Sequence, residues 1–303
     1  MEKSNHPERS LYLAIFFLTI FFTGISQDLD SLLKAEMGAE GTRKATVFRS
    51  TSLANGHSVT LLPPKTLDFR IEHRFGAVNS GFYELFGLDN ADIHFSFEYG
   101  ITRWLMAGVG RGTYEKTYDG FIRISPLNQQ TGDKPFPFSL SYQGAIYINT
   151  LRYLSELPDY KFSQRLEQVH QLMIGRIFKD LVSVQLTPSY LKRVPVMGFV
   201  EQLDLFALGT GLGVIITNGF SVNAEYFYIV NRDNDLNTIP IYNPLSISLD
   251  LETGGHIFQL IFSNSRSTTE HGNLGNTNGK WLEGDIYFGF NISRVFNFST
   301  NQQ

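Results

Sequence analysis

The segment from Pro244 to Ser265 restricts the fold of this chain more than any other stretch of its sequence. Its first half alternates apolar with polar side chains: Leu245, Ile247, Leu249 and Leu251 interleave with Ser246, Ser248, Asp250 and Glu252. After Gly254-Gly255, a second run places Phe258, Leu260 and Phe262 on one face. Because successive side chains of a strand point to opposite faces, each run has an apolar and a largely polar face. Two such runs joined by Gly-Gly predict a β-hairpin.

The two faces of this hairpin also indicate its surroundings. The carboxylates of Asp250 and Glu252 need water or internal partners, whereas an unbroken apolar row suits contact with lipid. Strands of this kind are typical of a transmembrane β-barrel, whose polar side faces the lumen. A soluble all-β fold is the alternative, and the length of the two-faced strands weighs against it.

The same alternation continues from Thr66 to the aromatic strand that ends near Phe298. Counting the candidates gives about twelve strands, an even number as in bacterial single-chain barrels. The predicted fold class is therefore all-β, a transmembrane antiparallel β-barrel. The longer connections are predicted to be external loops, with short turns at the other end: Asn128–Pro137, Leu151–Phe162, Asn231–Asn243 and Arg266–Lys280. The last is rich in Ser, Thr, Asn and Gly and is predicted to be exposed.

Composition narrows the function classes. The formal net charge of -4 and the absence of a basic patch argue against a nucleic-acid partner. The 26 Phe, 14 Tyr and 27 Gly suit aromatic girdles and glycine-bearing strands. Gly209, Gly211 and Gly213 share one parity, which permits bending or close packing at a barrel wall. Cysteine is absent, which excludes disulfides and thiolate metal sites.

The N-terminal region reads as an export signal followed by a segment of open role. Residues 1–26 are predicted to be a signal peptide, cut ahead of Gln27, because a basic end precedes the apolar run Leu11–Phe22 and small residues follow it. An uncleaved anchor is the alternative, and the shortness of the apolar run weighs against it. Residues 27–64 are an N-terminal arm, a luminal plug or, around Ser58–Leu62, a first strand. Residues 65–298 form the predicted barrel, and residues 299–303 a C-terminal tail. The expected location is the bacterial outer membrane.

Several segments, in order along the chain, resemble the landmarks of one family. They are His73–Gly76 (HRFG), Glu84–Asp89 (ELFGLD), Glu98–Thr102 (EYGIT), His170–Leu172 (HQL), Glu252–Gln259 (ETGGHIFQ), Asn264-Ser265 and Phe288–Phe296 (FGFNISRVF). Together they resemble the Bacteroidota-type β-barrel family known as domain of unknown function 5777, from about Phe48 to Phe296. The resemblance implies an outer-membrane barrel of a diderm bacterium. It brings no established activity, so no functional residue is carried over.

Charged and polar residues on the predicted inner face form the candidate site. They are Asp68, Arg70, Glu72, Arg74, His94, Glu98, Glu225, Asp250 and Glu252. One interpretation is a selectivity lining, in which rings of charge choose the solutes that pass. The other is a network that pairs internally and blocks the lumen, which mixed signs favour because a buried unpaired charge is costly. Asp250 and Glu252 suit either a cation or pairing with Arg70 or Arg74.

Catalysis has little support in the sequence. A lipid hydrolase would need a serine and a histidine side by side, and the candidates are Ser96, Ser263 and Ser265 with His73, His94, His170 and His256. None of these serines lies in a Gly-x-Ser-x-Gly motif. No calcium loop, His-x-x-x-His motif or phosphate-binding glycine loop is present. The sequence therefore predicts no catalytic residue, no metal and no cofactor.

The predicted role is passage or binding of a small or lipophilic solute by a monomeric barrel in outer-membrane lipid. The alternative is a scaffold whose loops or N-terminal arm bind a periplasmic or surface partner protein. A lipid hydrolase is third.

Overall fold

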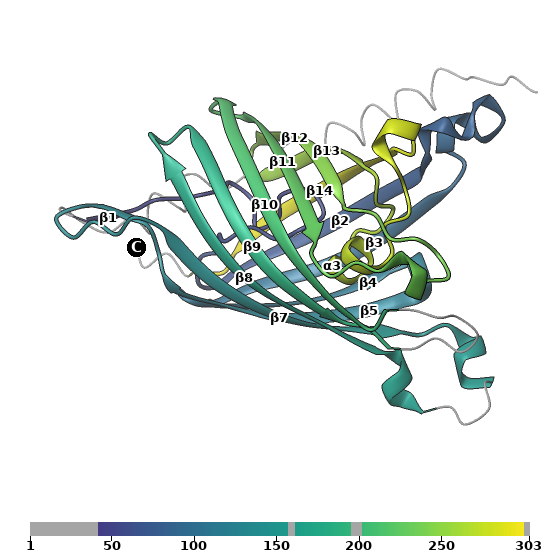
Figure 1. The fold of residues 1–303 in the computed structure, drawn as a ribbon. Coiled ribbons are helices and arrows are strands. Elements are labelled where there is room, and N and C mark those ends of the chain that lie inside the picture. The colour runs from purple at the N-terminus through teal and green to yellow at the C-terminus, as the bar shows by residue number, and fades with distance from the viewer. Residues whose placement is uncertain (1–41, 157–160, 195–201, 300–303) are drawn as a thin grey trace, which may run out of the picture.

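The computed structural model describes residues 42–156, 161–194 and 202–299, and in it twelve antiparallel strands close into a barrel (Figure 1). The barrel strands are β2 (Thr66–Ala77), β3 (Ala91–Thr102), β4 (Leu105–Gly112), β5 (Thr117–Leu127), β7 (Ser139–Asn149), β8 (Leu166–Phe178), β9 (Val182–Lys192), β10 (Asp204–Thr217), β11 (Phe220–Ile229), β12 (Leu245–Thr253), β13 (His256–Ser263) and β14 (Tyr287–Asn297). Pairing of β14 with β2 closes the ring. The predicted fold class and strand number are confirmed.

Short elements occupy the connections. Two small strands, β1 (Thr42–Lys44) and β6 (Gln130–Gly132), form a separate antiparallel pair. The helical turns are η2 (Val78–Ser80), η3 (Phe82–Gly87), η4 (Tyr114–Lys116), η5 (Arg152–Glu156), η6 (Phe162–Arg165), η7 (Asn234–Leu236), α3 (Glu270–Gly275) and η8 (Trp281–Glu283). In the part of the chain that the structure describes, no helix has the length and apolar character needed to cross a membrane.

The central hairpin forms as its sequence predicts. Leu249 pairs with Leu260 across β12 and β13, and Thr253 pairs with His256 at the turn. Gly254 and Gly255 have φ values of 56° and 77°, the left-handed conformation that a tight hairpin turn requires and that glycine adopts without steric cost. Ser246, Ser248 and Asp250 are buried inside the barrel, whereas Leu251, Phe258 and Leu260 are exposed on its outer wall.

The alternation of strand directions defines two ends of the barrel. The turns at residues 103–104, 179–181, 218–219 and 254–255 lie at one end, here called the short-turn end. The connections after β2, β7, β11 and β13 lie at the other, the long-loop end. One predicted external loop is on the wrong side: Asn128–Pro137 connects β5 to β7 at the short-turn end, where its β6 pairs with β1. The prediction rested on the length of the loop alone. The loop is long because it carries β6, which pairs with the N-terminal segment.

Residues 45–62, here called the N-terminal plug, run inside the barrel from the short-turn end (Figure 1). The plug reverses at a turn in which the Leu53 N–H donates to the Gly56 carbonyl at 2.8 Å. Val47, Phe48, Leu53 and Val59 form an apolar cluster with Met173 of β8. Nearer the short-turn end, Leu61 and Leu62 pack against Met106, Ile257 and Val295 of the wall. The plug therefore supplies much of the apolar core of the barrel.

A second segment fills the lumen from the long-loop end. All six residues of α3 are buried, and so are Ser267 and Thr277 beside it. The prediction that Arg266–Lys280 is an exposed loop is therefore wrong. Its polar side chains are satisfied inside the protein: the Thr277 hydroxyl donates to the Asn273 carbonyl at 2.6 Å, and Arg193 donates to Asn276 at 3.1 Å. A polar composition is compatible with burial when such partners are present.

Candidate functional site

The inner face of β2 is the base of the candidate site. Strand alternation points Asp68, Arg70, Glu72 and Arg74 inward, and each is at most 5% exposed. The register with β3 places Glu98 opposite Asp68 and His94 opposite Glu72. The structure thus brings together, on two neighbouring strands, six of the nine residues that the sequence suggested.

These groups bind both one another and the plug. Arg70 donates to the Asp68 carboxylate at 3.1 Å and to the Thr51 hydroxyl at 2.8 Å. The Thr51 hydroxyl in turn donates to Glu98 at 2.7 Å. A plug hydroxyl therefore links the arginine of β2 with the carboxylate of β3.

A histidine between two carboxylates lies one step towards the long-loop end. His94 Nδ1 is 2.7 Å from Glu72, and its Nε2 is 2.8 Å from Asp119 on β5. Sequence reasoning missed Asp119, because the alternation of β5 is too weak to fix which side chains face inward. This arrangement favours an imidazolium with both ring N–H groups donating to carboxylates.

The tip of the plug is held from two sides. Arg74 donates to the Asn55 side-chain oxygen at 2.7 Å and to Asn291 at 2.8 Å. Glu225 of β11 accepts the backbone N–H groups of Asn55 at 2.8 Å and Gly56 at 3.0 Å. The charges of Arg74 and Glu225 are thus directed at the plug.

Asp250 and Glu252 find partners other than the suggested arginines of β2. Asp250 accepts hydrogen bonds from Asn223 at 2.8 Å, Gln259 at 2.9 Å and the Ser248 hydroxyl at 2.7 Å. Glu252 forms an ion pair with plug residue Arg49 at 3.2 Å. Among the nine candidates, Glu252 therefore marks the short-turn end of the network.

Arg123 of β5 is a further member that the sequence did not single out. It is fully buried, and its Nη1 donates to three plug carbonyls: Thr51 at 3.3 Å, Ser58 at 3.2 Å and Thr60 at 3.1 Å. Gln185 of β9 completes this pattern, since it accepts from the Val59 N–H at 2.7 Å and donates to the His57 carbonyl at 2.9 Å. Wall side chains thus take the place of a neighbouring strand for the plug backbone.

Glycines in the wall make room for the plug. A Cβ atom on Gly211 would lie 2.7 Å from a methyl group of Leu53, and one on Gly213 would lie 2.9 Å from the Phe48 ring. A Cβ on Gly175 of β8 would lie 2.6 Å from Val59. The close packing predicted for this glycine row is packing against the plug at Gly211 and Gly213, and against Phe227 of the neighbouring strand at Gly209.

The two luminal segments meet at His57 and Glu270. Nε2 of His57 in the plug lies 2.7 Å from the Glu270 carboxylate of α3, which also accepts the Tyr147 hydroxyl. Burial alone raises the pKa of the Glu270 carboxyl, but the charge and hydrogen bond of His57 and the bond from Tyr147 outweigh it and hold this pKa at about 2. Glu270 is therefore ionised at neutral pH and binds both partners as a carboxylate.

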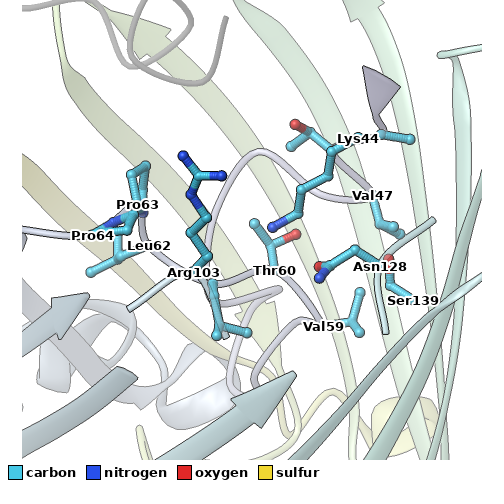
Figure 2. A pocket seen from close by; sticks show the side chains of 13 residues that line it. Lys44, Val47, Val59, Thr60, Leu62, Pro63, Pro64, Arg103, Asn128 and Ser139 are labelled. Carbon is cyan, nitrogen blue, oxygen red and sulfur yellow. The ribbon is translucent and has the colours of Figure 1, made fainter. Parts of the chain in front are cut away.

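Small cavities border this network. One of about 30 Å³ lies between the plug, α3 and the inner face of β2, β3 and β5, and is lined by His57, Arg70, His94 and Asp119 among others. Another of about 40 Å³ lies beside the plug at the short-turn end, where Figure 2 shows the side chains of Lys44 and Arg103 with Thr60 and Asn128. A water molecule needs roughly 10–15 Å³ by this measure, so each cavity has room for only a few waters.

The four candidate histidines contact groups other than the candidate serines. His94 binds two carboxylates. On the outer wall, Nδ1 of His170 forms a hydrogen bond of 2.7 Å with the Tyr142 hydroxyl. The rings of His73 and His256 stack on Phe290 and Phe258. The Ser263 hydroxyl is bound by Asn55 and Ser246. Within the described residues, no group of three or more His, Cys, Asp or Glu side chains is placed to hold a metal ion.

Residues 48–296 match the family model described as "Membrane bound beta barrel domain (DUF5777)". No curated protein matches the chain. Among solved structures, the chain is similar to the NanC porin (8% identity, 76% of this chain and 98% of that one, TM-score 0.44). It is also similar to the KdgM porin in complex with disordered oligogalacturonate (9% identity, 77% of this chain and 99% of that one, TM-score 0.43). A third similar structure is outer membrane phospholipase A from Escherichia coli (11% identity, 78% of this chain and 94% of that one, TM-score 0.39). At such low TM-scores, nothing about the role of this chain rests on these three.

Proposed function

The chain belongs to the membrane bound beta barrel domain family, as its sequence resemblance indicated, and we propose that it works as a gated channel of the outer membrane. In this proposal small polar solutes pass through the lumen of the barrel, and the N-terminal plug controls their passage. At rest the plug and α3 close the path. Movement of the plug opens it along the inner face of β2, β3 and β5.

The observation that carries this proposal is the chemistry of the contact between plug and wall. Arg123, Glu225 and Gln185 bind the plug backbone through hydrogen bonds. Water can replace such bonds at little enthalpic cost, so a wall of this kind can be wetted when the plug leaves. A plug that served only as a permanent core would be held as well by an apolar wall.

The test is single-channel conductance of the refolded full-length protein in a planar bilayer, with Arg123→Gln as the variant. We expect the wild type to be closed for most of the time. Loss of a hydrogen bond from a charged group costs about 1.5–3 kcal/mol, so the ratio of open to closed states should rise about tenfold or more. Arg111→Gln is the control, because Arg111 lies on the outer face of β4 against the Tyr118 ring.

Ion selectivity gives a second readout on the same channel. Acidic side chains outnumber arginines among the luminal residues described above, which predicts a preference for cations. Adding Glu72→Gln to the Arg123→Gln channel should weaken that preference and shift the reversal potential in a salt gradient. An unchanged reversal potential would show that the path does not run along β2.

Plug movement can also be measured directly, because the chain has no cysteine of its own. Ser58 lies in the plug and is fully buried, so a Ser58→Cys thiol should react with a soluble thiol reagent only when the plug moves. We expect slow labelling that becomes faster in the Arg123→Gln background. A Ser58→Cys thiol that stays unlabelled in both backgrounds would contradict the gating proposal and indicate a permanently filled barrel.

A partner-binding scaffold is the second candidate, and one observation favours it. The long-loop end carries large apolar side chains in full view of solvent: Phe82 is 80% exposed, Tyr83 is 91% exposed and Leu282 of η8 is fully exposed. Exposed apolar groups gathered in this way mark interaction sites. A scaffold should copurify with a stoichiometric partner that Phe82→Ser combined with Tyr83→Ser removes, while conductance of the channel stays the same.

A lipid hydrolase has weaker support, because the four candidate histidines bind carboxylates, aromatic rings or a tyrosine hydroxyl. The test is hydrolysis of phospholipid micelles by the wild type and by Ser96→Ala, Ser263→Ala and Ser265→Ala. Wild-type activity that one of these substitutions abolishes would place the hydrolase above the channel and the scaffold.

A further inference from the structure

The outer wall carries a groove that the proposed passage does not use. It crosses β8 to β12, which lie side by side in Figure 1, and has a volume of about 590 Å³. Ligand pockets in proteins have volumes of roughly 300–1,000 Å³, so the groove is large enough for part of a lipid.

Two cross-strand rows line this groove. In the first row, direct register partners on successive strands are Ile174, Leu186, Thr210, Tyr226 and Leu245. In the second row they are Arg176, Val184, Leu212 and Ala224. The small side chains of Thr210 and Ala224 lie between the larger Leu186, Leu212 and Tyr226 in this lining. The lining is therefore a strip of branched aliphatic and aromatic surface.

One cation lines this apolar strip. Arg176 lies two residues before the end of β8, at the short-turn end, and its guanidinium stacks at 4.7 Å from the centre of the Phe178 ring. It projects outward and is exposed, since Gly175 and Ile177 beside it face the lumen. Short turns of such barrels lie on the periplasmic side, so the end of β8 that carries Arg176 is expected to face the periplasmic leaflet. A guanidinium at this depth pairs well with phosphate, to which it donates two parallel hydrogen bonds.

We propose that this groove binds one anionic phospholipid of the periplasmic leaflet, with an acyl chain along the two rows and the phosphate on Arg176. The outer wall of a membrane-bound barrel is already in contact with lipid, and the groove and the cation convert one part of it into a specific site. The groove and the plug lie on opposite faces of the wall: Gln185 and Glu225, which hold the plug, also border the groove. Within the described residues Arg176 contacts no plug residue, so its substitution tests lipid binding separately from gating.

The experiment is native mass spectrometry of the full-length protein after exchange from vesicles of phosphatidylglycerol and phosphatidylcholine in equal amounts. The wild type should keep one phosphatidylglycerol in preference to phosphatidylcholine. Arg176→Gln should reduce the bound phosphatidylglycerol about tenfold or more, because the charge-assisted hydrogen bonds to the phosphate are lost, and should abolish the preference. Ala224→Trp should reduce binding of both lipids by filling the groove.

The barrel supplies a matched control for each variant. Arg294 on β14 is also outward-facing, exposed and near the short-turn end, and stacks at 5.0 Å on the ring two residues later, Phe296, but it does not line the groove. Ala107 on β4 is, like Ala224, a half-buried alanine on the outer wall, six strands away around the ring. Arg294→Gln and Ala107→Trp should keep the lipid within twofold of wild type.

Three results would overturn the proposal: a wild type that keeps no lipid, equal retention by Arg176→Gln, and equal loss in Arg294→Gln. The third would show a general effect of rim charge. Heat-modifiable gel mobility confirms that each variant is a folded barrel before its lipids are counted.

Discussion

Nε2 of His57 lies 2.7 Å from Oε1 of Glu270, and this contact joins two segments that enter the lumen from opposite ends. The plug and α3 are separated by more than two hundred residues of sequence, yet this polar contact joins them inside the barrel. A movement of the plug away from α3 breaks this contact. Its strength therefore sets part of the free-energy difference between closed and open states.

Removing the charge of Glu270 should loosen both segments at once. Glu270→Gln keeps the shape of the side chain but weakens the bonds from His57 and Tyr147, and should lower the free energy of unfolding by about 1–3 kcal/mol. The urea midpoint followed by gel mobility measures this loss. Glu283→Gln in the same connection is the control, because that carboxylate is 61% exposed and its pair with Lys280 should contribute nothing measurable.

The same carboxylate predicts a pH dependence. The pKa of Glu270 is lowered from 4.5 to about 2 in the folded protein, so the unfolded chain takes up a proton at higher pH than the folded one. The stabilisation is thus fully present above about pH 4.5 and is lost as pH falls towards 2. The difference in unfolding midpoint between wild type and Glu270→Gln should shrink over this range. A difference that stays constant from pH 7 to pH 3 would contradict an ionised Glu270.

Filling the glycine row should expel the plug. A leucine at position 211 would occupy the space of the Leu53 side chain, and overpacking of this kind costs about 1–3 kcal/mol. Gly211→Leu should therefore lower stability and raise conductance together, because the strain falls on the plug. Thr210→Val, one residue away and facing outward, should change neither property. A Gly211→Leu protein that is less stable but still closed would mean that the barrel wall yields instead.

The turn of the central hairpin should tolerate some residues better than others. Gly255 has a φ of 77°, and an L-residue in the left-handed region costs roughly 1–2 kcal/mol. Gly255→Val should therefore slow refolding into lipid vesicles and lower stability. Gly255→Asn should lose less, since asparagine enters this region several times more often than other residues. Equal effects of the two substitutions would mean that space, and not backbone conformation, limits position 255.

The position and facing of most strands could be predicted from the sequence. Alternation over Leu245–Leu251 or Leu67–Ile71 is a local property, because neighbouring side chains on a strand point to opposite faces whatever the rest of the chain does. The same rule placed Asp68, Arg70, Glu72 and Arg74 on one inner face. It said less about β5, whose Asp119 and Arg123 were missed.

Only the tertiary structure decided what fills the lumen. The polar stretch that contains Glu270 and Asn273 looks like an exposed loop, and residues 45–62 have no strong pattern, because neither forms a two-faced strand. Their burial depends on partners far away in the sequence: Glu225 for Asn55, Arg123 for Ser58, and His57 for Glu270. The sequence by itself determined the barrel, because the alternation of apolar and polar residues is a local property of each strand. The closure of its lumen follows from hydrogen bonds between segments that meet only when the ring of strands has formed.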